Sequence, residues 1–115
     1  SAFLAEGPRG VAAAWETRGQ IGMARLAPSS GAVTSVTSPP GSGQRKHPVL
    51  AYNARGEALL AWLEDSAWAR GGSVAWQVYD ADGQATPERG SARGVPPWGL
   101  AAVAPLRDGR WLVLY

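Results

Sequence analysis

Three short apolar runs recur along this chain, each opened by a turn glycine and carrying an aromatic residue near its end. They occupy Gly10–Glu16, Gly56–Glu64 and Gly109–Tyr115. The aromatic residues stand 47 and then 53 residues apart, at Trp15, Trp62 and Tyr115. Self-similarity at a nearly fixed period of this length indicates a repeated supersecondary unit.

The flanks of these runs repeat as well. A short apolar segment precedes each run, at Ala2–Ala5, Pro48–Tyr52 and Leu100–Ala104. A segment that alternates apolar with small or polar residues follows the first two runs, at Ile21–Leu26 and Ser73–Tyr79. Alternation with a period of two predicts strands that bury one face.

Turns and a polar strand complete each unit. Asp80–Gly83 is a hairpin signal, because glycine accepts the positive φ that such turns require. The polar segments Ala32–Val36 and Gln84–Glu88 suit exposed edge strands, where threonine and proline are tolerated. The pattern predicts ten strands in groups of four, four and two. It predicts no helix, because no capped window has the helical period.

The predicted fold class is all-β, with about two and a half four-stranded antiparallel units in one 115-residue segment. The first unit covers about residues 1–40, the second about 47–91 and the half unit about 98–115. Loops rich in proline and glycine connect them, at Ser38–His47 and Ser91–Gly99. A compact sandwich of two face-packed sheets is the alternative architecture.

The repeat resembles the blades of β-propellers in the sialidase-like superfamily and in uncharacterised bacterial extracytoplasmic propeller proteins. Asp80–Thr86 carries part of the Asp box of that family, without its leading serine and closing tryptophan, and Pro28–Gly31 lacks the aspartate. The Asp box is a structural turn there. The family's arginine triad and its Tyr/Glu pair cannot be assigned to residues of this chain. The resemblance implies propeller blades and favours a periplasmic or secreted location.

Composition narrows the function classes. The chain has 11 basic and 9 acidic residues, a formal charge of +2, and its basic residues are scattered. A nucleic-acid surface needs a basic stripe, so no nucleic acid partner is expected. With no cysteine and one histidine, the sequence predicts no metal site and no cofactor. No apolar stretch reaches the length of a membrane span.

Five loop residues are candidates for contact with a partner. The second unit inserts Ser66–Gly72 between its second and third strands, and this insertion contains Trp68 and Arg70. Insertions in repeats commonly lie on a binding face, and Trp and Arg anchor many interfaces. The remaining three candidates precede the first strands of the second and third units, at Arg45, His47 and Trp98. A simple packed loop is the competing interpretation for all of them.

Acidic residues in the turns have structural interpretations. Asp80 and Asp82 fit a hairpin turn better than a calcium loop, which needs more oxygen ligands. Glu64 and Asp65 are sequence neighbours at a strand end and point to opposite sides, which favours solvated turn acids over a glycosidase pair. The sequence offers no catalytic residue, and the chain is not assigned as an enzyme.

The leading hypothesis is a non-enzymatic β-propeller interaction or scaffold module that belongs to a larger chain or assembly. The alternative is a carbohydrate-binding or glycoside-hydrolysing propeller. Two units cannot close a ring, since propellers use about 4–8 blades. We therefore expect the edge of Trp111–Tyr115 to be covered by a protein partner or by the remainder of its own propeller.

Overall fold

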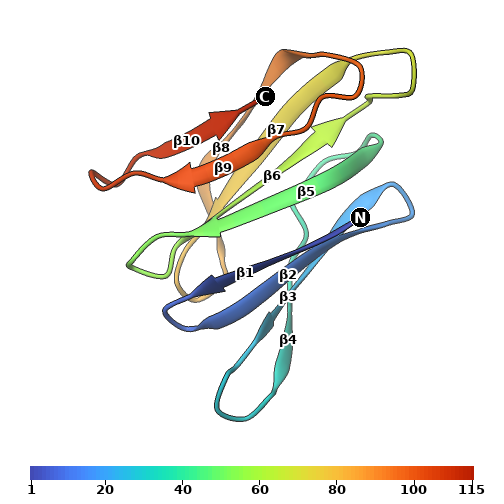
Figure 1. Cartoon of the computed structure of the whole chain (residues 1–115). Coiled ribbons are helices and arrows are strands. Elements are labelled where there is room, and N and C mark those ends of the chain that lie inside the picture. The colour runs from blue at the N-terminus through green and yellow to red at the C-terminus, as the bar shows by residue number, and fades with distance from the viewer.

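A computed structural model describes all residues, 1–115, as ten antiparallel β-strands without a helix (Figure 1). The strands form sheets of four, four and two, which confirms the predicted grouping. In each sheet the strands follow one another in chain order, so every connection within a sheet is a hairpin. Three sheets are present, not the two of a simple sandwich.

The first sheet has the order β1-β2-β3-β4, and its strands span Ala2–Gly7, Gly10–Thr17, Gln20–Leu26 and Val33–Val36. The second has the order β5-β6-β7-β8, with strands at Arg45–Tyr52, Ala58–Glu64, Gly72–Tyr79 and Ala85–Val95. The third pairs β9 with β10, at Ala102–Pro105 and Trp111–Leu114.

The second sheet is longer at both ends than the sequence predicts. β8 continues to Val95, through residues expected to form a loop, because its pairing with β7 persists to Gly72↔Val95 across two register shifts. β5 begins at Arg45, since Arg45 pairs with Glu64 before a bulge between Lys46 and Val49. The second unit therefore spans 45–95 instead of 47–91. Irregular pairing of this kind leaves no alternation to recognise in the sequence.

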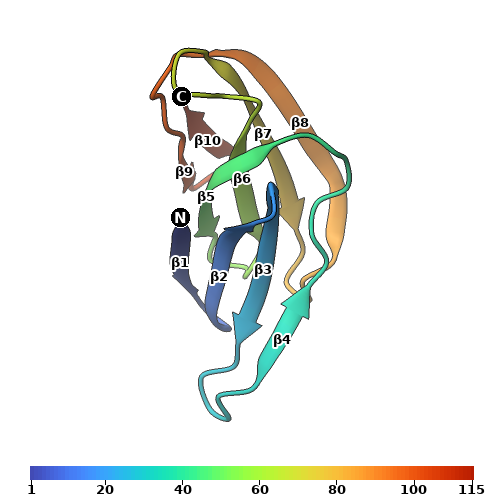
Figure 2. The same ribbon diagram turned by 90° about the vertical axis from the view of Figure 1, so that its right-hand side faces the viewer.

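The sheets pack face against face in chain order. One core joins the first and second sheets, and its residues are Ala12, Ala14, Ile21, Met23, Val36, Leu50, Ala58, Leu60, Trp62, Ala75 and Tyr79. A second core contains Ala61, Leu63, Val74, Val95 and Ala101, and Val103 and Val113 of the third sheet pack against it. Seen from the side, the first strands β1, β5 and β9 lie along one side and β4 and β8 along the other (Figure 2).

Two tryptophans pack over glycines of the neighbouring strand. Trp15 pairs with Gly22, and a Cβ on this glycine would lie 2.5 Å from the indole. Trp76 pairs with Gly90 in the same way, and a Cβ there would lie 2.6 Å from its indole. Only glycine leaves room for the ring at these positions, which explains why glycines occur inside the strands.

Left-handed backbone recurs at equivalent places in the repeat. Arg18 and Asp65, both between the second and third strands of their sheets, have φ of 52° and 57°. His47 and Trp98, both near the first strand of a unit, have φ of 54° and 66°. Positive φ is uncommon outside glycine. It occurs here in the β2–β3 and β6–β7 connections, within β5 and just before β9.

Tyr79 provides a pH test of the core between the first two sheets. It is 1% exposed, its hydroxyl donates to Thr37 O at 3.0 Å, and burial raises its pKa to about 12, against a smaller opposing effect of Arg45. The fold favours the neutral phenol. Its contribution is fully present below the unfolded pKa near 10 and is lost as the pH rises through 12.

We expect the free energy of unfolding to fall by about 2–3 kcal/mol between pH 10 and 12 on account of this residue. Urea unfolding at closely spaced pH values measures the loss. Tyr79→Phe is the control, because it lacks the titrating group and its stability should change less over the same interval. Equal slopes for the two proteins would contradict the assignment.

No helix in the structure has the length and apolar character needed to cross a membrane.

Candidate functional site

Two loops meet at one end of the second sheet and enclose a cleft. The β6–β7 loop and the segment between β8 and β9 lie at the upper right of Figure 1. The cleft between them has a volume of about 380 Å³. It is lined by Lys46, His47, Ser66, Ala67, Trp68, Trp98, Gly99 and Leu100. Three of the five predicted candidates, His47, Trp68 and Trp98, therefore lie together.

The two tryptophans form the most exposed aromatic surface of the molecule. Trp68 is 78% exposed and Trp98 is 70% exposed, and their ring centroids lie 4.6 Å apart with an interplanar angle of 69°. This is an edge-to-face contact, a favourable aromatic geometry. Each ring supports the other while most of its surface faces solvent.

Tight turns hold both rings in place. Ala67 and Arg70 exchange backbone hydrogen bonds of 2.9 and 3.1 Å, so Trp68 stands at the tip of a small hairpin. Gly99 N donates to Pro96 O at 2.9 Å, which places Trp98 third in a four-residue turn. Its φ of 66° is the conformation that favours glycine at this place. A large side chain held in left-handed backbone marks a candidate functional position.

His47 and Lys46 form the polar side of the cleft. The left-handed backbone of His47 lets its N–H donate to Glu16 Oε1 at 2.7 Å, which ties β5 to the first sheet. The side chains of Lys46 and His47 remain partly exposed in the cleft. Ser66 adds a hydroxyl, and no carboxylate belongs to the lining. The site therefore combines indole surface with hydrogen-bond donors and positive charge.

Arg70 stands beside the cleft without lining it. Its Nε donates to Asp65 O at 3.1 Å, and the residue is exposed. Arg45 is different, because it is only 3% exposed and its guanidinium faces inward. Arg45 donates to the carbonyls of Pro39 and Pro40 at 2.7 and 2.5 Å. It cannot be presented to a partner as the sequence suggested, since its donors already hold the β4–β5 loop.

The acidic side chains that the sequence offers as candidates for calcium binding or glycoside hydrolysis accept hydrogen bonds from nearby groups. Asp80 Oδ1 accepts the backbone N–H of Asp82 and of Gln84, each at 2.9 Å, as the hairpin interpretation expects. Glu64 Oε1 accepts the indole N–H of Trp62 at 2.9 Å, and Asp65 Oδ1 accepts Gln44 N at 3.3 Å. No group of three His, Asp or Glu side chains is placed to hold a metal ion.

A second surface of interest is the outer edge of β10, which pairs only with β9. Leu106 N donates to Arg110 O at 2.8 Å, and this bond fixes the phase of the hairpin. In antiparallel pairs the hydrogen-bonded residues alternate, so Leu112 turns its backbone groups to β9. Trp111 and Val113 turn theirs to the open edge. Leu114 beside them is 58% exposed.

A hollow of about 470 Å³ lies next to this edge, between the second sheet and β10. Its walls are mostly apolar and include Leu59, Trp76, Val78, Trp111 and Val113. Between the first and second sheets the third strand β7 covers Ile21 and Met23 with Ala75 and Tyr79. No third strand stands beside β10, and Trp76 is left half-buried at the hollow, whereas Leu59 and Val78 are already buried.

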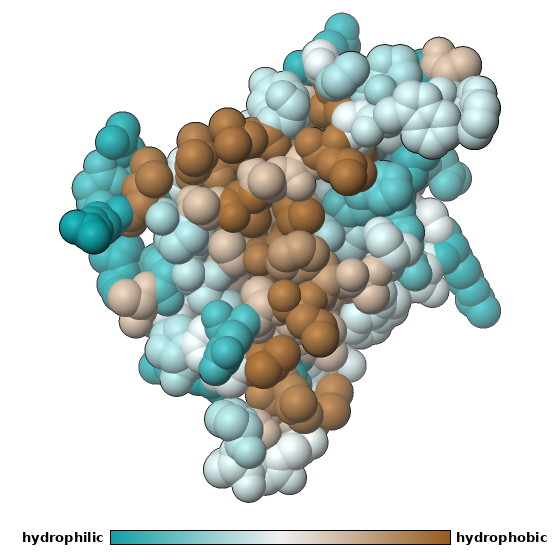
Figure 3. Space-filling model, viewed as in Figure 1, coloured by the Kyte–Doolittle hydropathy of each residue, from teal (hydrophilic) through white to brown (hydrophobic).

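Apolar side chains also gather where the first strands of the three sheets lie side by side. In Figure 3 they run from β9 and β10 across β5 to β1. The exposed apolar residues of these strands include Leu4 of β1 and Leu112 and Leu114 of β10. Contiguous exposed apolar surface of this kind is typical of an interaction face.

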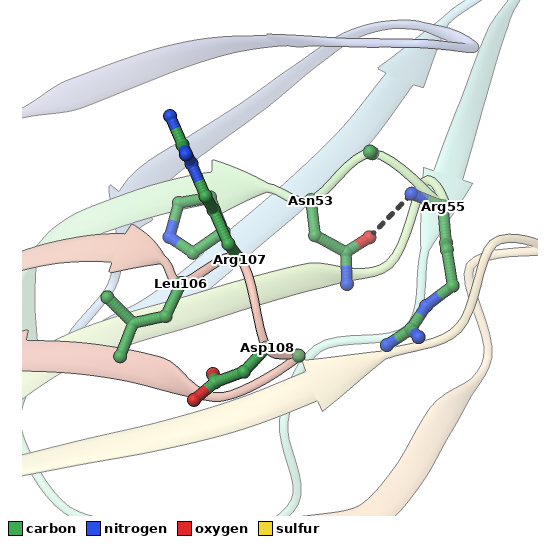
Figure 4. A pocket seen from close by; sticks show the side chains of 8 residues that line it. Asn53, Arg55, Leu106, Arg107 and Asp108 are labelled. Atoms are coloured by element: carbon green, nitrogen blue, oxygen red, sulfur yellow. Dashed lines mark hydrogen bonds between the residues drawn. The ribbon is translucent and has the colours of Figure 1, made fainter.

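A third hollow, of about 420 Å³, lies between the turns β5–β6 and β9–β10 (Figure 4). Asn53 Oδ1 accepts the N–H of Arg55 at 3.0 Å, and Arg55 pairs with Glu57 at 2.8 Å. Asp108 pairs with Arg110 at 2.7 Å. The Arg107 side chain points away from Asp108 in Figure 4. These charged groups serve their own turns, and the hollow is a weaker candidate than the cleft.

Comparisons of the chain with protein-family models, curated proteins and solved structures gave no match.

Sequence reasoning missed Lys46, Ser66 and Leu100 of the cleft and the walls of the hollow beside β10. Lys46 lies in a bulged strand that was expected to be a loop. Leu59 and Val78 are themselves buried residues of regular strands, so nothing in the sequence marks them as walls of a hollow. Two signals in the sequence indicate the cleft: the insertion Ser66–Gly72, and the similar positions of His47 and Trp98 before an apolar segment.

Proposed function

We propose that this chain is a non-enzymatic interaction or scaffold module, made of two propeller-type blades and the inner half of a third. In this proposal the open side of β10 is covered by strands from a protein partner or from the rest of its own propeller. The single observation that carries it is the two-stranded third sheet, with an unpaired edge beside an apolar hollow.

Three features support the proposal. The units repeat in strand order and in their left-handed turns. The sheets stack in chain order, with β1, β5 and β9 along one side, as inner strands of successive blades do (Figure 2). An unpaired strand edge with outward N–H and C=O groups is a template for an added strand. The added strand would place side chains over the half-buried Trp76, as β7 places Ala75 and Tyr79 in the core between the first two sheets.

Hydrogen exchange tests the proposal on the protein in its native assembly. In the isolated chain we expect the amides of Trp111 and Val113 to exchange rapidly, because they face the open edge. In the assembly purified from its source they should be protected. The Leu112 amide faces β9 and is the internal control, since it should be protected in both. A native protein that is a monomer of this chain with freely exchanging Trp111 and Val113 amides contradicts the proposal.

Val113→Pro probes the same edge by mutation. Proline removes the outward N–H and is tolerated on an exposed edge, so the isolated chain should keep its fold while association is lost. Leu112→Pro is the matched control, because it breaks the β9 ladder and should unfold the hairpin. Native mass spectrometry measures association, and an unchanged assembly mass with Val113→Pro would argue against strand addition.

A second candidate function, carbohydrate binding, is favoured by one specific observation. Trp68 and Trp98 are exposed together on hydrogen-bonded turns, beside hydrogen-bond donors. Indole faces in such a setting suit the C–H faces of sugar rings as well as protein side chains.

A further inference from the structure

We propose that the cleft between Trp68 and Trp98 binds an acidic carbohydrate, with the sugar ring stacked on an indole and its carboxylate held by Lys46 and His47. This inference deepens the second candidate function and rests on it alone. It is independent of the β10 edge, which lies on other strands.

The aromatic geometry favours stacking of a sugar ring on an outer indole face. The centroids of the two indole rings lie 4.6 Å apart in an edge-to-face contact, so no slot remains between them for a proline ring or an aliphatic side chain. Recognition of proline-rich peptides uses aromatic-lined grooves, and strand addition uses an unpaired edge. The backbone groups of Ala67 and Arg70 at the tip of this loop are already bonded to each other. The cleft therefore offers stacking surface rather than a peptide groove.

The charges of the cleft favour an anion. Lys46 and His47 line it together with the Ser66 hydroxyl, and none of its residues carries a carboxylate. Glu16 lies outside the lining, but its Oε1 is 4.0 Å from His47 Nδ1, so Lys46 is the cationic group of the cleft that has no carboxylate partner. A cation would meet Lys46 without a counter-charge, which disfavours an aromatic-cage ligand such as a quaternary ammonium group. A uronic-acid unit supplies both an apolar ring face and a carboxylate.

The backbone conformation of Trp98 is unfavourable for a residue with a large side chain. Its φ of 66° lies where glycine is favoured, and left-handed non-glycine residues are held only by their surroundings. Replacing Trp98 by glycine removes the ring and relieves the backbone. The fold and the binding are thus expected to respond in opposite directions, which separates a structural role from a ligand-binding one.

Isothermal titration calorimetry with an oligogalacturonate tests the proposal. Wild-type protein should bind it, and Trp98→Gly and Trp68→Ala should each raise the Kd about tenfold or more, as expected for exposed aromatic anchors. Trp98→Gly should unfold at the same temperature as wild type or higher. Lys46→Gln should raise the Kd about two- to fivefold, the effect of one partly exposed ion pair. Arg107→Gln, at the other end of β9, removes the same charge and should leave the Kd unchanged.

Two further probes decide the ligand class. A neutral cello-oligosaccharide of the same length should bind more weakly than the oligogalacturonate, and a proline-rich peptide should not bind. Equal binding of the neutral sugar overturns the role of charge, and binding of the peptide instead overturns the carbohydrate assignment. Oligogalacturonate binding that survives both tryptophan substitutions, or no binding at all, overturns the site. None of these results changes the hydrogen exchange of the β10 amides. A failure of the carbohydrate proposal can therefore be distinguished from a failure of the proposal that this chain is an interaction module.

Discussion

Trp62→Ala is expected to destabilise the fold by about 3–5 kcal/mol, the range for removing a large buried aromatic side chain. Trp62 is 3% exposed and belongs to the core that joins the first two sheets. Its indole N–H donates to Glu64 Oε1 at 2.9 Å, and the Arg45 guanidinium lies 5.0 Å from its ring centroid. The substitution therefore opens a cavity and removes a hydrogen bond and a cation–π contact together. Urea unfolding followed by far-ultraviolet circular dichroism measures the loss.

Trp68→Ala is the matched control for this prediction. It makes the same chemical change only a few residues along the chain, on an exposed loop tip, and should shift stability by no more than about 0.5 kcal/mol. Trp62→Phe keeps an aromatic ring but removes the indole donor and part of the buried volume. Its loss should lie between about 1 kcal/mol, for the lost bond, and the full loss of Trp62→Ala. If Trp62→Ala and Trp68→Ala unfold at the same urea concentration, the core between the first two sheets does not depend on Trp62.

The number and grouping of strands could be predicted because the repeat carries three independent signals at once. Gly56 ends the turn before β6, Ala58–Leu63 is apolar throughout, and Asp80–Gly83 forms the turn between β7 and β8. Alternation in Ile21–Leu26 then identifies the buried face, since Ile21 and Met23 are both buried. Local pattern and overall arrangement agree here, which is the condition for reading structure from sequence.

The ends of the second sheet could not be predicted for a physical reason. β8 is polar and contains Gly90 and Gly94, so its pairing depends on β7 rather than on its own pattern. Gly90 is required because the Trp76 indole lies over it, a contact between strands that sequence spacing does not reveal.

The candidate site could be predicted in part for the same reason. Trp68 and Trp98 stand out as large residues in loops rich in glycine and proline, but their contact is created by two turns 30 residues apart. Arg45 shows the limit of this reasoning. A basic residue next to Lys46 and His47 looks like part of a surface cluster, yet the strand begins at Arg45 and turns its side chain inward. Whether a loop charge faces solvent depends on the strand register, which the bulge in β5 obscures.

Arg45→Met should destabilise the fold by about 2–4 kcal/mol, although methionine fills similar space and buries well. The guanidinium holds the carbonyls of Pro39 and Pro40 and lies 3.3 Å from Glu64 Oε1 through Nε. Replacing a whole buried ion pair with apolar residues is often neutral, but this change removes only one partner. Two carbonyls lose their donor, and the Glu64 side chain, 24% exposed, loses its counter-charge.

Arg70→Met is the matched control, since Arg70 is exposed and makes one bond to a backbone oxygen. Its effect should stay within about 0.5 kcal/mol. The double variant Arg45→Met/Glu64→Gln should recover part of the loss, because the unpaired carboxylate is then gone while the proline carbonyls still lack a donor. Arg45→Lys should fall between, because one ammonium on a flexible stem reproduces the planar fork poorly. If Glu64→Gln lowers the stability of Arg45→Met by as much as it lowers that of the wild type, the two residues do not interact. In that case the loss in Arg45→Met comes from the β4–β5 loop.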